Sequence, residues 1–399
     1  MPAPLAGLLV ADFSRVLAGP LATMTLADLG ATVVKVERPG AGDDTRSWGP
    51  PWTATSSAYF DGLNRSKYSL TLDLADPADR TAAGDLAARA DVVIHNLRPA
   101  GMLSFGLDYD SVAAANPTVV YCTITGFGPS ADLPGYDFLV QAVGGLMSIT
   151  GSPGGEPTKA GVALVDVLTA KDATIGILAA LNRRHSTGQG DHVQVNLLSS
   201  LLGSLVNQTS GYLATGTPPG RMGNRHPSIA PYETLRCADA PIAVACGNDR
   251  QFTRLCQELG TPHLATDPRF ADNPSRVAHR EALVTELERA LATATAREWE
   301  QRLTTAGVPV GLIGDIGDAI ARAESYGLDP LVPLPGPASP GGARAFQIRH
   351  PVTYSGASTE PPARPPALGE HTAAIRAWLA RPPGTPLPHP AADSPPRRP

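Results

Sequence analysis

Strand-like and helix-like segments alternate through the first 126 residues, and this alternation constrains the fold more than any other feature of the chain. Short apolar runs predict buried strands, and helical spacing or turn residues follow most of them. The predicted strands are 7–14, 31–39, 68–74, 91–96 and 118–128. Strands separated by helices form βαβ units, so we predict an α/β fold with a Rossmann-like, mainly parallel sheet covered on both faces.

Composition divides the rest of the chain, whose 399 residues are enough for two domains. Stretches rich in Gly and Pro predict linkers, and a mixed α+β pattern lies between the two linkers. The Pro-rich end of the chain predicts disorder. The predicted order is a large domain at 1–215, a linker at 216–231, a small domain at 232–327, a linker at 328–345, a C-terminal segment at 346–380 and a disordered tail at 381–399.

Charge and composition exclude several classes of function. A net charge of −5, with Lys and Arg spread along the chain, argues against a nucleic-acid or membrane partner. The N-terminus does not resemble a signal peptide, and no apolar run reaches the roughly 20 residues of a membrane span, so we expect a soluble, cytoplasmic protein. The four Cys and nine His residues match no metal-binding spacing, so we expect reduced thiols and no metal.

Asp166 is the one carboxylate of an otherwise apolar run, 162–167, at the point where a helical pattern begins that extends to about His185. The predicted buried face of that helix comprises Leu168, Ile175, Leu178 and Leu181. A charge in such a position requires a partner or a function. Two interpretations are open at this point: an N-cap of the helix, or a nucleophile.

Ligands of open parallel sheets bind beyond the carboxyl ends of the strands. Arg38 and Arg98 follow predicted strands, so each is a candidate phosphate ligand, although each is equally compatible with an ordinary surface position. No GxGxxG motif follows the first strand, which argues against a nicotinamide dehydrogenase.

Several segments, taken together and in order, resemble the family III CoA-transferases, the group that includes formyl-CoA and carnitine CoA-transferases. The resemblance extends from about residue 5 to residue 378. The segments that carry it include "DFSRVLAGPLATMTLADLGATVVKVERPG", "DVVIHNLRPAGM", "PGYDFLVQAVGGLMSITG", "RRHSTGQGDHVQVNLL", "GNRHPSIAPYETL" and "LGEHT".

The resemblance implies that Asp166 is the catalytic nucleophile, and that CoA thioesters are substrates rather than tightly bound cofactors. CoA would pass from an acyl-CoA donor to a carboxylic acid through an aspartyl anhydride and an aspartyl-CoA thioester. Because an aspartate has a reference pKa of about 3.9, we expect Asp166 to be ionised at neutral pH without a general base. Backbone N–H groups at a helix N-terminus would stabilise the oxyanion.

The resemblance also implies a set of CoA contacts, with Arg38 paired to phosphate and with Tyr136 and Asp137 beside the thioester. Core packing remains an alternative role for Val16 and Leu72. The implied CoA-binding residues are Val16, Ala18, Arg38, Leu72, Asp73, Leu74, Asn96, Leu97, Arg98, Tyr136 and Asp137.

Three positions depart from the pattern of the family. Ser104 and Leu133 stand where basic residues are common, which removes candidate phosphate contacts. Leu17 replaces a Gln of the formyl-CoA transferases, and their Gly-rich loop is absent. We therefore expect an acid larger or more apolar than oxalate or formate, and the family's dicarboxylate, aromatic and betaine acceptors all remain open.

Two other functions compete with CoA transfer. The 2-methylacyl-CoA racemases share this fold but carry His where this chain has Tyr136, and a tyrosine with a pKa of about 10 is a poor base. The other alternative is a non-catalytic CoA-binding protein, but the retained Asp166 argues against it. The resemblance further implies an interlocked homodimer in which segment 346–380 returns to the large domain.

Overall fold

The computed structural model describes residues 2–53, 56–131, 133–335, 345–358 and 361–387. The chain forms two compact units, one of Met1–Leu146, Ala160–Ala214 and Asp329–Pro399 and one of Met147–Lys159 and Thr215–Leu328. Part of the predicted linker, 336–344, and part of the predicted tail, 388–399, lie outside the described residues.

A six-stranded parallel sheet forms the centre of the larger unit and confirms the predicted α/β fold. Its strands are β1 (Leu9–Asp12), β2 (Thr32–Glu37), β3 (Lys67–Thr71), β4 (Val92–His95), β5 (Val120–Thr125) and β6 (Asp191–Asn196). The order is β3-β2-β1-β4-β5-β6, so the chain winds outward in opposite directions from β1 and β4. Such a reversal opens a crevice at the carboxyl ends of β1 and β4, where ligands of this architecture bind.

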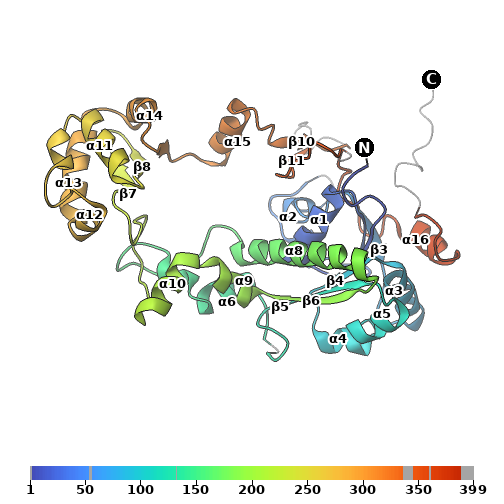
Figure 1. Ribbon diagram of the computed structural model, residues 1–399. Coiled ribbons are helices and arrows are strands. Elements are labelled where there is room, and N and C mark those ends of the chain that lie inside the picture. The colour runs from blue at the N-terminus through green and yellow to red at the C-terminus, as the bar shows by residue number, and fades with distance from the viewer. Residues whose placement is uncertain (1, 54–55, 132, 336–344, 359–360, 388–399) are drawn as a thin grey trace, which may run out of the picture. The chain divides into compact units, whose positions relative to one another are not determined.

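Helices cover both faces of this sheet (Figure 1). The helices of the larger unit are α1 (Ala18–Asp28), α2 (Ala58–Asp61), α3 (Pro77–Arg89), α4 (Pro99–Ser104), α5 (Tyr109–Ala115), α6 (Asp137–Val143), α8 (Leu164–Thr187), α9 (Leu197–Ser204), α10 (Val206–Thr215) and α16 (Thr372–Leu379). One face packs against α1 and α8, and α3, α5 and α16 contribute to the apolar cluster on the other.

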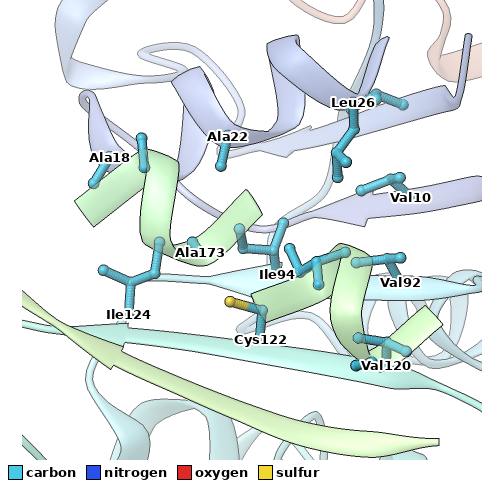
Figure 2. Close-up of a cluster of buried hydrophobic side chains, with 14 of the residues drawn as sticks. Val10, Ala18, Ala22, Leu26, Val92, Ile94, Val120, Cys122, Ile124 and Ala173 are labelled. Atoms are coloured by element: carbon cyan, nitrogen blue, oxygen red, sulfur yellow. The ribbon is translucent and has the colours of Figure 1, made fainter. Parts of the chain in front are cut away.

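Small side chains bring α1 and α8 close to the sheet (Figure 2). Ala18 and Ala22 of α1 and Ala173 of α8 pack on Ile94 and Cys122, all of them buried. The buried face predicted for α8 was partly wrong. Ile175 is 64% exposed, whereas the alanine-rich stripe faces the core, because a helix lying directly on a sheet needs small residues at the contact.

The second unit has its own apolar core around an antiparallel sheet of β7 (Tyr232–Arg236), β8 (Pro241–Ala245) and β9 (Val310–Leu312). Its helices are α7 (Leu146–Ile149), which begins at the boundary, α11 (Asp249–Glu258), α12 (Asn273–Ala278), α13 (Arg280–Leu291), α14 (Ala296–Thr305) and α15 (Ile316–Ser325). Two buried guanidiniums are neutralised within the unit, Arg276 by Asp249 and Arg280 by Glu233.

The C-terminal part of the chain packs on the larger unit. β10 (Leu331–Pro333) pairs with β11 (Phe346–Ile348), and α16 inserts Ile375 and Trp378 into the apolar cluster beside α3. Arg89 of α3 lies over the Trp378 ring and donates a hydrogen bond to the carbonyl of Leu379. Among the described helices, none is both long and apolar enough to span a bilayer.

Candidate active site

Asp166 lies inside the first turn of α8, three residues after the helix boundary at Ala163. The apolar run 162–167 was predicted to precede the helix, but α8 already begins at Leu164. Asp166 is therefore not the N-cap, and this interpretation was wrong. Its carboxylate accepts no hydrogen bond from the described residues, so it is available for chemistry.

Asp137, the first residue of α6, performs the capping instead. Its Oδ1 accepts hydrogen bonds from the backbone N–H groups of Val165 at 2.8 Å and Asp166 at 3.2 Å. Its Oδ2 accepts from Nε2 of the buried Gln141 at 2.7 Å, and Oε1 of Gln141 in turn accepts from the N–H of Ala160. This cap from another helix ties α6 to the start of α8 and brings two carboxylates together.

Two glycines hold the segment before α6 against the end of β5. A Cβ on Gly135 would lie 2.6 Å from the Cα of Gly126, and a Cβ on Gly126 would lie 2.4 Å from the Cα of Gly135. The two backbones therefore touch directly, which only glycine allows. The Gly135 of "PGYD" thereby positions Asp137 over the first turn of α8.

Burial raises the pKa of Asp166 to about 7, and the neighbouring charge of Asp137 adds to this effect. The expectation that Asp166 is fully ionised at neutral pH was therefore wrong, because its folded environment is neither aqueous nor isolated. The expected oxyanion donors also need correction. The N–H groups of Val165 and Asp166 already donate to Asp137.

Tyr59 of α2 interacts electrostatically with Asp166 and Asp137, a role that its sequence context does not indicate. Burial raises its pKa to about 12, and the negative charges of Asp166, Asp137 and Asp43 contribute. The Tyr59 hydroxyl therefore stays neutral and keeps its proton in the electrostatic field of Asp166. Its position depends on the tertiary fold, and an aromatic residue in a short, irregular segment gave no signal of this role.

The turn between β1 and α1 lies at the crevice of the sheet and brings several predicted residues together. Asn96, which follows β4, exchanges hydrogen bonds with the N–H and carbonyl of Arg15 at 2.9 and 2.7 Å. Val16 donates its N–H to the Asp43 carboxylate. Arg38 forms an ion pair with Asp44, which also pairs with Arg15 at 3.0 Å. Asn96, Val16 and Arg38 therefore converge on one rim.

The remaining predicted residues occupy varied environments. Ala18 and Leu72 are each only 2% exposed, and Leu74 and Leu97 pack against the core, so the packing alternative holds for the side chain of Leu72. The side chains that reach the surface belong to Asp73, Arg98 and Tyr136, the last of which is 61% exposed.

The two departures from the expected basic pattern are also at the surface. Ser104 donates its hydroxyl to the carbonyl of Gly101 within α4, and Leu133 is 61% exposed. Neither side chain offers a charge to a phosphate.

A cavity of about 410 Å³ lies on the other face of the sheet from α8. His95, Thr123 and His192 line it, with Thr123 Oγ1 3.1 Å from His95 Nε2 and 2.9 Å from His192 Nε2. These side chains alternate with Ile94, Cys122 and Val193, which face α1 and α8. None of the predicted site residues lines this cavity, so the candidate active site comprises Asp166 with Asp137 and the rim residues Val16, Arg38 and Asn96 instead.

Comparison with known proteins identifies the family. A model described as CoA-transferase family III matches residues 5–372. The chain belongs to CoA-transferase family III. This confirms the resemblance on which the site prediction depended, and it identifies the protein as an enzyme of CoA transfer between acyl-CoA and acids.

This CoA-transferase has relatives of nearly its own length. A succinate–glutarate CoA-transferase of Agrobacterium fabrum is 42% identical over 393 residues, covering 94% of this chain and 96% of the relative. An acetyl-CoA:oxalate CoA-transferase of Acetobacter aceti is 40% identical, covering 95% and 96%. A crystal structure of a CAIB/BAIF family protein from Brucella suis superposes with a TM-score of 0.83 at 43% identity, covering 95% of this chain and all of that one.

Proposed function

We propose that this CoA-transferase works through covalent intermediates on Asp166. The observation that carries the proposal is a carboxylate in the first turn of α8 that accepts no hydrogen bond from the described residues, lies beside Asp137 and acts electrostatically on Tyr59. A partly desolvated carboxylate is a better nucleophile than an aspartate at the surface. A site that limits water also protects an anhydride from hydrolysis.

The first half of the reaction removes CoA from its donor. An oxygen of Asp166 attacks the thioester carbonyl and the C–S bond breaks. This step releases CoA as a thiolate and forms an aspartyl–acyl anhydride. The thiolate then attacks the aspartyl carbonyl and expels the donor acid as a carboxylate. Asp166 now carries CoA as a thioester.

The second half repeats these steps in reverse with the acceptor. The acceptor carboxylate attacks the aspartyl thioester, releases the thiolate and forms a new anhydride. The thiolate attacks the acceptor carbonyl, which yields acceptor acyl-CoA and restores the Asp166 carboxylate. Tyr59, as a neutral donor, is suited to hydrogen-bond an oxyanion in these steps, since the amides at the α8 start already serve Asp137.

The CoA moiety would lie along the crevice rim in this proposal. The turn residues Val16 and Ala18, the segments 72–74 and 96–98, and Arg38 would contact it, with Tyr136 and Asp137 towards the thioester. For the buried Leu72 and Ala18, backbone groups rather than side chains would make the contact. Arg38 is more than half exposed at the rim, as a phosphate ligand requires.

The substrate acids would be dicarboxylic acids. Relatives at 40–42% identity carry names with succinate, glutarate and oxalate, which share two carboxylates. The replacement by Leu17 of the Gln in formyl-CoA transferases favours the longer acids. Succinyl-CoA as donor and glutarate as acceptor is therefore the first pair to test.

The working assembly would be an interlocked homodimer, joined through the segments 216–231 and 328–345. Within the described chain, no residue of α10 is buried, and Leu213 on it is 81% exposed. Phe138 and Val143 of α6 are 54% and 68% exposed. Exposed apolar side chains concentrated on these short helices favour an interface that covers them. The molar mass in solution, measured by light scattering, tests whether the protein is a dimer.

Intact-protein mass spectrometry with a panel of acyl-CoA donors tests the mechanism. We expect a CoA-sized or acyl adduct on the wild type, no adduct on Asp166→Ala, and an unchanged adduct on Asp172→Ala, an exposed aspartate of the same helix. Turnover without any adduct, together with exchange of the α-hydrogen of the acyl group, would contradict the proposal and indicate a racemase-type isomerase. CoA binding without turnover would indicate a binding protein.

A further inference from the structure

Buried charged side chains form hydrogen bonds with the turn between β1 and α1. Ser14 donates its N–H and hydroxyl to Asp12 Oδ1 at 2.9 and 2.5 Å, and its carbonyl accepts from Lys35 Nζ at 2.8 Å. Asn96 satisfies both backbone groups of Arg15. Side chains from other elements therefore bind successive backbone groups of a turn that contains no regular structure.

Val16, the next residue of this turn, has a φ of +70°. A positive φ is rare for a β-branched residue because its side chain clashes with the backbone. Such a conformation persists only where its surroundings impose it, and it is found preferentially at functional sites. Here the N–H of Val16 is shared between the two carboxylate oxygens of Asp43, at 3.3 and 3.2 Å.

Asp43 is itself fixed by a buried ion pair. Its Oδ2 lies 2.9 Å from Lys35 Nζ, and both side chains are fully buried. Thr45 donates its N–H and its hydroxyl to Asp43 Oδ1 at 2.9 and 2.8 Å. The Lys35 ammonium therefore contacts both the Asp43 carboxylate and the Ser14 carbonyl. The Asp43 carboxylate in turn accepts the N–H of Val16, so the ion pair holds the turn at residue 14 and at residue 16.

We propose that Asp43, held by Lys35, is a positioning residue that keeps Val16 in its left-handed conformation and so shapes the turn that receives CoA. The proposal rests on the proposed function for the CoA contact, because Val16 and Ala18 are the residues through which it acts. A buried ion pair contributes little net stability compared with apolar packing. Its use here is to fix one backbone geometry.

The test combines Asp43→Asn with Val16→Gly. In Asp43→Asn one carboxylate oxygen becomes an NH2 group. This group either faces the Lys35 ammonium, which it cannot bind, or takes the place of the oxygen that accepts from Val16 and Thr45. In both orientations the contacts that fix the backbone of residue 16 are weakened. We expect the Kd for CoA, measured by calorimetry, to rise about tenfold, since a hydrogen bond to a charged group is lost. The rise in KM for acyl-CoA should exceed the fall in kcat, because Asp43 acts on the turn and touches no reacting atom.

Glycine at position 16 adopts a positive φ without strain and needs no clamp. The Kd of Val16→Gly for CoA is the reference for the double variant. Adding Asp43→Asn to Val16→Gly should raise this Kd by less than about threefold, so the double variant should recover most of the affinity that Asp43→Asn alone loses. This recovery is the readout that a merely structural role of Asp43 would not produce, because glycine restores no stability to the Lys35 pair.

Asp28→Asn is the matched control. It breaks another buried ion pair of the larger unit, Asp28–Arg65 at 2.6 Å, which lies away from the turn. We expect it to lower the melting temperature as Asp43→Asn does and to leave the Kd for CoA unchanged. Equal losses of CoA affinity in Asp28→Asn and Asp43→Asn, or no recovery in the double variant, would overturn the proposal.

Failure of the proposal differs from failure of the proposed function. A wild-type protein that does not bind CoA would remove the function itself. In that case the amide exchange rate of Val16 still decides the structural part: it should rise in Asp43→Asn and stay slow in Asp28→Asn. An unchanged rate in Asp43→Asn would show that this carboxylate does not hold the turn.

Discussion

The Oδ1 atom of Asp137 accepts a hydrogen bond from the backbone N–H of Asp166 at 3.2 Å. One carboxylate therefore caps α8 and places a negative charge beside the proposed nucleophile. Burial is the main cause of the raised pKa of Asp166, about 7, and this charge adds to it. Helix capping and the ionisation of Asp166 are thus coupled through a single side chain.

Asp137→Asn separates these two effects. The amide oxygen can still accept from the amides of Val165 and Asp166, but the charge is gone, so the pKa of Asp166 should fall. We expect the acid limb of the kcat/KM profile, near pH 7 in the wild type, to move down by about one pH unit. A loss of activity without any change in the pH profile would show that Asp137 does not influence the ionisation of Asp166.

Asp166→Asn should make the protein more stable above neutral pH. The pKa of Asp166 is raised from 3.8 to about 7 on folding, so between these values the folded state holds the proton more tightly than the unfolded state. The stabilisation this provides is complete below pH 4 and is lost as the pH rises through 7. The variant should therefore exceed the wild type by about 4 kcal/mol at pH 8 and match it near pH 4.

Urea unfolding at pH 4.5, 6 and 8 measures this difference. The gap between variant and wild type should widen with pH and level off above pH 8. Asp172→Asn, on the exposed face of α8, should show no such trend. A constant gap at all three values would mean that Asp166 is not desolvated in the folded protein.

The sheet was predictable because buried parallel strands are contiguous apolar runs. Segments 31–39 and 91–96 were predicted as strands, and the structure has β2 at Thr32–Glu37 and β4 at Val92–His95. The start of α8 was not predictable in the same way. Its cap comes from Asp137, 29 residues upstream of Asp166, and local capping patterns do not reveal a cap from another helix.

The site was predicted through family motifs, and its electrostatics were not. Asp166, Asn96 and Arg38 were proposed as site residues because they lie in recognisable segments. The raised pKa of Asp166 and the position of Tyr59 depend on tertiary neighbours. Lys35 in the middle of an apolar strand was a visible anomaly, since a buried ammonium requires a partner. Its partner Asp43 lies in an irregular segment whose path only the folded chain defines.

Gly135→Ala should displace Asp137 and impair catalysis. The added methyl would lie 2.6 Å from the Cα of Gly126, and neither backbone can move without shifting the start of α6. We expect a loss of about 2 kcal/mol in stability from overpacking and a fall in kcat larger than the rise in KM for acyl-CoA. Gly84→Ala in α3, where a Cβ meets nothing within 4 Å, is the control and should retain activity. Full activity of Gly135→Ala would show that this backbone contact does not position the site.

Asp44→Asn should strengthen CoA binding. In the structure Asp44 pairs with both Arg38 and Arg15, so its carboxylate competes with a phosphate for the Arg38 guanidinium. Without that competitor, the Kd for CoA should fall by about two- to fivefold at low salt, as expected for an exposed ion pair. The gain should shrink at 0.5 M salt because exposed charges are screened. Arg38→Ala should weaken binding and cancel the gain in the double variant. If Asp44→Asn strengthens CoA binding equally with and without Arg38, the phosphate role of Arg38 is wrong, and the effect comes only from the net charge of the rim.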